Sequence, residues 1–289
     1  TKVGMTPFVS TSDSKITFEF PLNERFRTFL RIENLLHRWQ YYLRSTTKED
    51  HHTAILTLLD IYDFSFRNDV KGDLLSELAR YKQALSQYFS SPDVSEDKLN
   101  QTILRLVDAY KQIEQSPKFG GNLADNEWLI NIKSRLVVSA SVCSFDMGFY
   151  YQWLQDSEQR RLNDLHEWVQ PFVPMFDAVT LLLQLSRNLA LTKDCVTNSY
   201  AYQQPLSGRK FDIMRVEFAN TSNYLPDFSA NKHVIWLRFA APVVSVRSSA
   251  KTMQRTMQEE VAFRLGLCGV PATSPVAQRE QVHPFYSAL

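Results

Sequence analysis

Apolar residues recur with two different spacings along the chain, and the spacing changes once. From Pro21 to Leu191 they return every three or four residues, which is typical of amphipathic helices that bury one face. Beyond Thr192 they alternate with polar residues, which is typical of half-buried strands. The segment Lys15–Phe20 alternates in the same way near the other end of the chain. The pattern therefore predicts an α+β fold in which an N-terminal strand joins a C-terminal antiparallel sheet.

Polar, glycine and proline positions divide the helical part into eight periodic segments. We expect Pro21 to open the first helix, because proline is tolerated in a first helical turn. Ser95 is expected to cap the fourth helix, and Asp146 to cap the short sixth helix. The segments that we expect to be helical are 21–43, 52–66, 71–89, 96–115, 124–136, a short one that ends near 154, 157–168 and 172–191.

The C-terminal part contains four further candidate strands, with pieces rich in turn residues at 204–208 and 225–229. Together with the N-terminal strand they would make one sheet of five strands. The candidate strands are 199–203, 211–219, 233–241 and 260–267. The expected organisation is a flexible leader at 1–14, a strand of the β domain at 15–20, a helical bundle domain at 21–191, a β domain at 192–268 and a flexible tail at 269–289.

The composition disfavours an enzyme that binds nucleotides or metals. Only 8 of the 289 residues are glycine, where average usage predicts about 20, and no phosphate loop or metalloprotease motif is present. Asp63, Asp69 and Asp73 come nearest to a metal-binding cluster, but carboxylates at helix edges are usually solvated. The 3 cysteines lack the spacing of a zinc ribbon or a disulfide framework. We therefore expect no catalytic residue, no metal and no cofactor.

The sequence also predicts a cytoplasmic protein rather than one inserted in a membrane. The first residues are polar and lack the basic and apolar regions of a secretory signal. The most apolar stretch, 173–191, contains Asp177 and Arg187, and each charge costs about 2.5–3.5 kcal/mol at the centre of a membrane span. Widely spaced cysteines agree with reduced thiols in the cytosol.

Positive charge is concentrated near the C-terminus, although the formal net charge of the whole chain is only +1. Residues 209–289 contain ten basic and six acidic side chains. On the candidate strand 233–241, Arg238 shares a face with Trp236, and a cation beside an aromatic ring suits an acidic peptide with apolar anchors. A charge that protects a strand edge, or a surface salt bridge, is the structural alternative. A basic aromatic face also fits a second function, that of a nucleic-acid-binding module.

Three stretches of the chain together resemble the ZapD family, bacterial division proteins associated with the tubulin-like protein FtsZ. Residues 18–33 (FEFPLNERFRTFLRIE) resemble its opening signature, which is the longest and most specific of the three. Residues 143–146 (CSFD) with Trp153 and Leu154 resemble its central motif. The closing strands of the family resemble 229–232 (SANK), 236–239 (WLRF) and 260–268 (EVAFRLGLC).

The resemblance implies a homodimer with a helical domain and a curved β domain, located at midcell. It also implies a protein without enzymatic activity that binds the C-terminal tail of FtsZ and cross-links FtsZ filaments. The residues that it points to for tail binding, beside the aromatic Trp236, are Arg67, Arg135, Lys232 and Arg238. Four residues of the opening signature match the family but are expected to make fold or dimer contacts: Arg25, Arg27, Arg31 and Glu33.

The chain departs from the family pattern at three positions near these residues. Glu127 stands where an arginine is expected, Tyr151 where a histidine is expected, and Asn231 also replaces a histidine. The resemblance therefore implies a tail-binding surface whose positive charge is reduced or rearranged relative to the usual family pattern.

Overall fold

The computed structural model describes residues 15–89, 94–123, 125–136, 143–198, 201–219, 224–240 and 260–270. The leader and all but the first two residues of the tail lie outside this part of the chain. The chain divides into two compact units. Of the described residues, those up to Asn23 and those from Ser186 onward form a β unit, and those between Glu24 and Leu185 form a helical unit.

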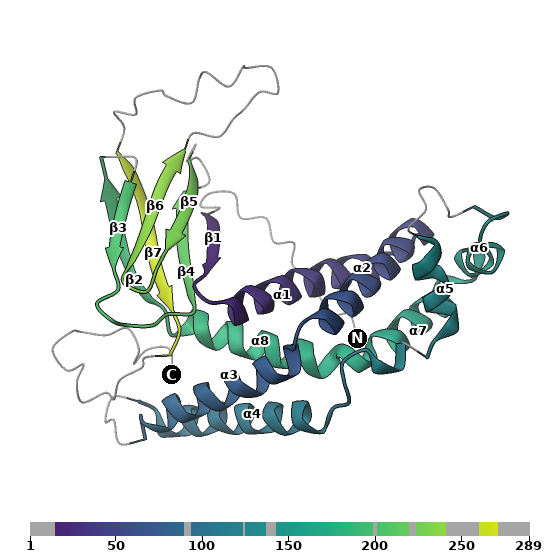
Figure 1. Cartoon of the computed structure of the whole chain (residues 1–289), viewed down its shortest axis with the longest axis horizontal. Coiled ribbons are helices and arrows are strands. Elements are labelled where there is room, and N and C mark those ends of the chain that lie inside the picture. The colour runs from purple at the N-terminus through teal and green to yellow at the C-terminus, as the bar shows by residue number, and fades with distance from the viewer. Residues whose placement is uncertain are drawn as a thin grey trace, which may run out of the picture. The chain divides into compact units, whose positions relative to one another are not determined.

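The helical unit contains the long helices α1 to α4 and the shorter α5 to α7, and most of α8 (Figure 1). Two single 3₁₀ turns, Gly121–Leu123 and Gln170–Phe172, lie between α4 and α5 and between α7 and α8. The helix bounds are α1 Glu24–Leu43, α2 Lys48–Arg67, α3 Val70–Ser86, α4 Glu96–Gln115, α5 Glu127–Arg135, α6 Gly148–Gln155, α7 Glu158–Val169 and α8 Val173–Asn188.

Side-chain caps fix the start of several helices. Thr47, Asp69, Asn126 and Ser157 each accept a hydrogen bond from a backbone N–H in the first turn of the helix that follows. Ser95 lies at the expected cap position of α4, but its side chain makes no capping bond. The prediction for α6 is wrong, because Met147 and not Asp146 precedes its first turn.

The core of the helical unit combines aromatic and aliphatic side chains from most of its helices. Phe26, Leu58, Tyr81 and Leu182 are completely removed from solvent. The continuous helical stretch Glu158–Asn188 is long and apolar enough to cross a membrane by length and composition, within the part that the structure describes. Since 61% of its most apolar window is buried inside the protein, its composition is that of a core helix.

The β unit contains two antiparallel sheets. One sheet has the strand order β1-β4-β7-β2, and the other has the order β3-β6-β5. The strands are β1 Lys15–Pro21, β2 Leu191–Thr197, β3 Ala201–Pro205, β4 Ile213–Ala219, β5 Leu225–Ala230, β6 Val234–Ala240 and β7 Val261–Cys268. As expected, the N-terminal strand joins this unit, because β1 pairs with β4 from Lys15↔Ala219 to Pro21↔Ile213.

The predicted α+β class is confirmed, but the prediction of one five-stranded sheet is wrong. The described residues form seven strands in two sheets. Two strands were not predicted: β2, whose residues after the expected helix end at 191 were assigned no element, and β5, which was expected to be a turn. Pro21 was also misassigned, since it ends β1 and the first helix begins at Glu24.

The two sheets share one hydrophobic cluster. Phe218 and Phe263 from the four-stranded sheet lie against Phe239 from the three-stranded sheet, with ring centroids 5.9 and 5.1 Å from Phe239. Cys195 and Cys268 are buried in this unit as free thiols, and burial raises the pKa of Cys268 to about 12. These cysteines therefore act as small core residues.

Candidate partner-binding surface

Strand β6 presents its two predicted binding residues on the outer face of the three-stranded sheet. Ile235, Leu237 and Phe239 point into the core, and each is at most 3% exposed. The alternate residues Trp236 and Arg238 therefore face outward, Trp236 half-buried and Arg238 exposed. The structure thus confirms that these two side chains share a face.

The flanking strands add a single charged side chain, that of Asp227, beside Trp236 and Arg238. In register, Trp236 lies between Gln203 of β3 and Ser229 of β5. Arg238 lies between Ala201 and Asp227. Asp227 is thus the direct cross-strand neighbour of Arg238, although no ion pair within 4 Å joins them in the described structure. The guanidinium remains accessible to a carboxylate from outside.

Lys232 lies in the tight turn between β5 and β6, where its side chain is exposed. Asn231 shapes this turn, because its side-chain oxygen accepts hydrogen bonds from the backbone N–H groups of His233 and Val234 at 2.8 and 2.9 Å. Asn231 therefore has a structural role in the turn that carries Lys232.

In the helical unit, Arg67 is the last residue of α2 and its side chain is 78% exposed. Its guanidinium lies 4.0 Å from the carboxylate of Asp63, which also pairs with Lys133 of α5. The single negative charge of Asp63 cannot neutralise both Arg67 and Lys133. The end of α2 therefore keeps a positive surface.

Aromatic rings that were not predicted from the sequence accompany these cations. Phe66 is 55% exposed and stacks on Tyr62 with centroids 6.0 Å apart. The ammonium of Lys118 lies 3.9 Å from the centre of the Phe66 ring, and that of Lys133 lies 4.6 Å from the Tyr62 ring. The sequence feature that could have indicated these rings is Phe66. It is a large apolar residue next to Arg67 at the end of a helix, where side chains are normally polar.

Comparison with known proteins gives the family. The family model for ZapD, described as a cell division protein, matches residues 30–238. The Cell division protein ZapD of Janthinobacterium sp. (strain Marseille) is 33% identical over 255 residues, which cover 88% of this chain and 99% of that protein. The chain belongs to the ZapD family. The resemblance seen in the sequence is therefore confirmed, and with it a role in cell division.

The opening signature of the ZapD family lies largely on α1, where Arg25 joins two helices. Its guanidinium donates to Asp73 at 3.0 Å and to Glu77 at 2.8 Å, both on α3. Glu77 is only 4% exposed and also pairs with Arg80, so this arginine neutralises a carboxylate inside the fold. The other signature residues lie nearby on α1: Arg27 pairs with Glu24 at 3.2 Å, Arg31 is exposed and Glu33 is half-buried.

Residues 143–146, which resemble part of the central motif of the ZapD family, precede α6 and contact the end of α5. Arg135, the last residue of α5, donates a hydrogen bond of 3.0 Å to the backbone carbonyl of Asp146. Phe145 beside it is 84% exposed. The guanidinium of Arg135 thus has a fold contact, while the neighbouring ring remains open to solvent.

The positions that might have formed a metal site are occupied by structural contacts. Asp69 caps α3, Asp73 pairs with Arg25, and Asp63 pairs with Lys133. Among the residues that the structure describes, no three His, Cys, Asp or Glu side chains come close enough to hold a metal ion.

The predicted binding residues fall in both units. The structure brings Trp236 and Arg238 together on one strand and places Lys232 in the turn before it. Arg67 and Arg135 belong to the helical unit, at the ends of α2 and α5.

Proposed function

We propose that this cell-division protein binds the C-terminal tail of FtsZ and, as a homodimer in the cytoplasm, cross-links FtsZ filaments at midcell. The outer face of β6 is the observation that carries the proposal. There an exposed guanidinium, that of Arg238, lies two residues from a half-buried indole, that of Trp236. Membership of the ZapD family supports the cellular process.

The chemistry of this face suits a peptide that mixes acidic and apolar residues. The indole of Trp236 offers apolar surface, and Arg238 can form two parallel hydrogen bonds to one carboxylate. Lys232 adds a second positive charge in the turn before β6. The proposal assigns apolar anchoring to the ring of Trp236 and acidic recognition to Arg238 and Lys232.

Cross-linking follows from two tail sites in one particle. A filament displays many tails, so a dimer that has bound one tail meets the next at high effective concentration. Contacts that are weak individually can therefore bundle filaments. Cross-linking by two tail sites needs no catalytic residue and no cofactor.

Co-sedimentation with FtsZ tests the proposal. We expect the protein to pellet with polymerised FtsZ and not with polymerised FtsZ that lacks its C-terminal tail. Arg238→Glu should weaken tail binding by about 1 kcal/mol or more, roughly fivefold, because an attractive charge becomes repulsive. Arg264→Glu is the matched control, since Arg264 is an exposed arginine of β7 in the other sheet, paired with Asp194 at 2.7 Å. Equal pelleting with and without the tail would refute the tail mechanism.

A nucleic-acid-binding function is the alternative, and a competition assay between oligonucleotide and tail peptide distinguishes the two. Binding to an oligonucleotide falls steeply as salt rises, since each phosphate contact releases counterions. The carboxylate of Asp227 beside Arg238 disfavours such a polyanion at this face. We expect the tail peptide to displace any bound oligonucleotide, whereas an oligonucleotide that resists displacement would favour the alternative.

A further inference from the structure

The outer face of the three-stranded sheet carries a carboxylate beside its guanidinium. Asp227 of β5 lies directly across from Arg238 of β6 in the antiparallel register, and both side chains are exposed. Directly opposite residues of an antiparallel pair have Cβ atoms about 4.5–5.5 Å apart. No ion pair joins these two side chains in the part of the chain that the structure describes. A ligand on this face therefore meets a negative and a positive group side by side.

The packing of β5 fixes which of its side chains face outward. Phe228 packs against the hydrophobic cluster of the β unit and stacks on Phe20 of β1, with ring centroids 5.2 Å apart. Because side chains alternate along a strand, Asp227 and Ser229 on either side of Phe228 lie on the outer face. Leu225 lies on the same face and is 47% exposed. The outer face therefore continues past the charged pair to an exposed leucine.

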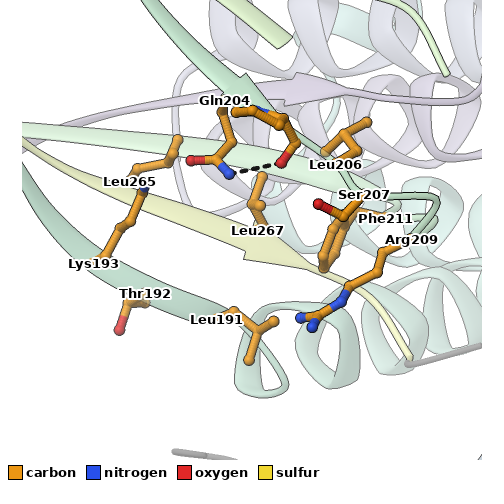
Figure 2. Close-up of a pocket in the computed structure, with 11 residues that line it drawn as sticks. Leu191, Thr192, Lys193, Gln204, Leu206, Ser207, Arg209, Phe211, Leu265 and Leu267 are labelled. Carbon is orange, nitrogen blue, oxygen red and sulfur yellow. Dashed lines mark hydrogen bonds between the residues drawn. The ribbon is translucent and has the colours of Figure 1, made fainter. Parts of the chain in front are cut away.

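Strand β3 borders the other side of this face without adding a charge. Tyr202 and Gln204 are half-buried, and Gln204 lines a pocket of about 280 Å³ beside β2 (Figure 2). Ala201 and Gln203 alternate with them and are exposed, so they lie on the outer face, next to the two outward residues of β6. Neither is charged, so the acid–base pair on this face consists of one residue from β5 and one from β6.

Apolar side chains lie on both sides of the charged pair. Along β6, Trp236 precedes Arg238 by two residues, and the half-buried Ala240 follows it by two. Ala240 is the direct cross-strand neighbour of Leu225. Successive residues of a strand rise by about 3.3–3.4 Å, so Trp236 and Leu225 are separated by about 13 Å along the strand direction. An extended peptide covers this distance in about four residues.

We propose that Asp227 is a specificity-determining residue of the tail-binding face and selects an FtsZ tail segment in which a basic residue accompanies the acidic one. The inference rests on the proposed function and specifies the ligand of the same face. Arg238 binds a carboxylate of the tail, and Asp227 binds the cation of a nearby tail residue. Trp236 and Leu225 contact apolar tail residues about four positions apart.

This arrangement discriminates against a tail segment that is only acidic. Such a segment leaves Asp227 without a partner and places a like charge beside it, which lowers the affinity. Because Asp227 and Arg238 are both exposed, water and salt weaken each contact. The expected discrimination is therefore about fivefold rather than several hundredfold.

Calorimetric titration of the full chain with two peptides tests this role of Asp227. One peptide is the C-terminal tail of FtsZ, and in the other every Lys and Arg of that tail is replaced by Gln. General attraction to a basic surface would favour the second peptide, because it is more negative. We expect the wild-type chain to bind it about fivefold more weakly. Asp227→Asn, which removes the charge and keeps the size, should bind the second peptide at least as tightly as the first.

Two matched controls come from the other sheet. Asp194→Asn removes an exposed carboxylate of β2 that pairs with Arg264 at 2.7 Å, and it should keep the fivefold discrimination. Leu225→Ser should weaken binding of both peptides about threefold, because it removes an apolar contact. Val196→Ser removes an apolar side chain of β2 that is 54% exposed, and it should leave both affinities unchanged.

The outcomes separate this inference from the proposed function. If tail binding falls in Arg238→Glu but the wild-type chain does not discriminate between the two peptides, the role of Asp227 is overturned and tail recognition stands. An FtsZ tail without Lys or Arg, or a discrimination that persists in Asp227→Asn, would overturn it as well. Failure of the wild-type chain to bind either peptide would refute both the inference and the proposed function.

Discussion

His51 is a buried histidine whose hydrogen bonds require the neutral ring. It is completely removed from solvent, and the Nε–H group of Arg161 donates to its Nδ1 at 3.0 Å. Its Nε2–H donates to the carbonyl of Ser45 at 2.8 Å. Protonation of Nδ1 would replace the bond from Arg161 with repulsion between two cations. Burial, as the larger cause, lowers the pKa of His51.

We expect this histidine to make the protein less stable in mild acid. Because its pKa is lower in the folded state, the unfolded chain takes up a proton first as the pH falls below about 6.5. The free energy of unfolding should therefore decrease from pH 7.5 toward pH 5, with a slope of at most about 1.4 kcal/mol per pH unit from this group. Urea unfolding at several pH values measures the slope.

His51→Gln should flatten this pH dependence, because the glutamine side chain cannot take up the proton. The matched control is His37→Gln, which removes an exposed histidine of α1 and should keep the wild-type slope. His52 contributes in the same direction, since burial lowers its pKa too, so part of the slope should survive in the His51 variant. A wild-type slope in His51→Gln would contradict the assignment.

Gly269 is the residue at which backbone conformation and packing both require glycine. Its φ is +140°, and a Cβ atom there would lie 2.8 Å from the carboxylate of Asp212 and 3.0 Å from its backbone nitrogen. Gly269→Ala should therefore destabilise the β unit by about 2 kcal/mol or more. Gly266→Ala is the control, because Gly266 lies three residues earlier on strand β7 and its Cβ would make only ordinary contacts at 3.5 Å or more. Thermal unfolding of both variants checks the difference.

At the scale of elements, the carboxylate of Glu19 attaches β1 to the β unit, because two arginine side chains share it. Glu19 accepts hydrogen bonds from Arg187 at 2.6 and 2.9 Å and lies 3.1 Å from Arg215. All three side chains are less than one-third exposed. Glu19→Gln should cost about 2 kcal/mol of stability, because two half-buried guanidinium groups lose their common partner. Asp194→Asn removes the exposed pair with Arg264 and should leave the midpoint of urea unfolding unchanged.

The elements that the sequence predicted correctly are those in which pattern and burial agree. Strand β6 alternates between buried and exposed residues over its whole length, and its position was found. Strand β2 has no such pattern, because its exposed run Thr192, Lys193 and Asp194 belongs to the last strand of a sheet. Pro226 made β5 look like a turn, although proline is tolerated in an outer strand that pairs on one side only.

The binding surface was predictable where a single element creates it. Trp236 and Arg238 lie two residues apart, so strand periodicity alone places them on one face. The rings beside Arg67 were not predictable in this way, because Lys118 and Lys133 reach Phe66 and Tyr62 from separate segments of the chain. The carboxylate beside Arg238 was not predictable either, because it belongs to β5, which the sequence did not show as a strand.

At the scale of the whole molecule, the proposed cross-linking predicts that binding and bundling respond differently to mixed dimers. A dimer should have twice the 33.5 kDa chain mass, which sedimentation velocity measures. When wild-type chains exchange with a threefold excess of the Arg238→Glu variant, only about one sixteenth of the dimers keep two intact sites, whereas about six sixteenths keep one.

Mixed dimers with one intact site should bind a filament without joining it to another. Bundling measured by light scattering should therefore fall much more steeply with added variant than the amount of wild-type chain that pellets with FtsZ. Adding Arg264→Glu chains in the same ratio controls for exchange itself, because these dimers keep both tail sites. If bundling fell only in proportion to the wild-type fraction, single chains would suffice for cross-linking, and the two-site mechanism would be wrong.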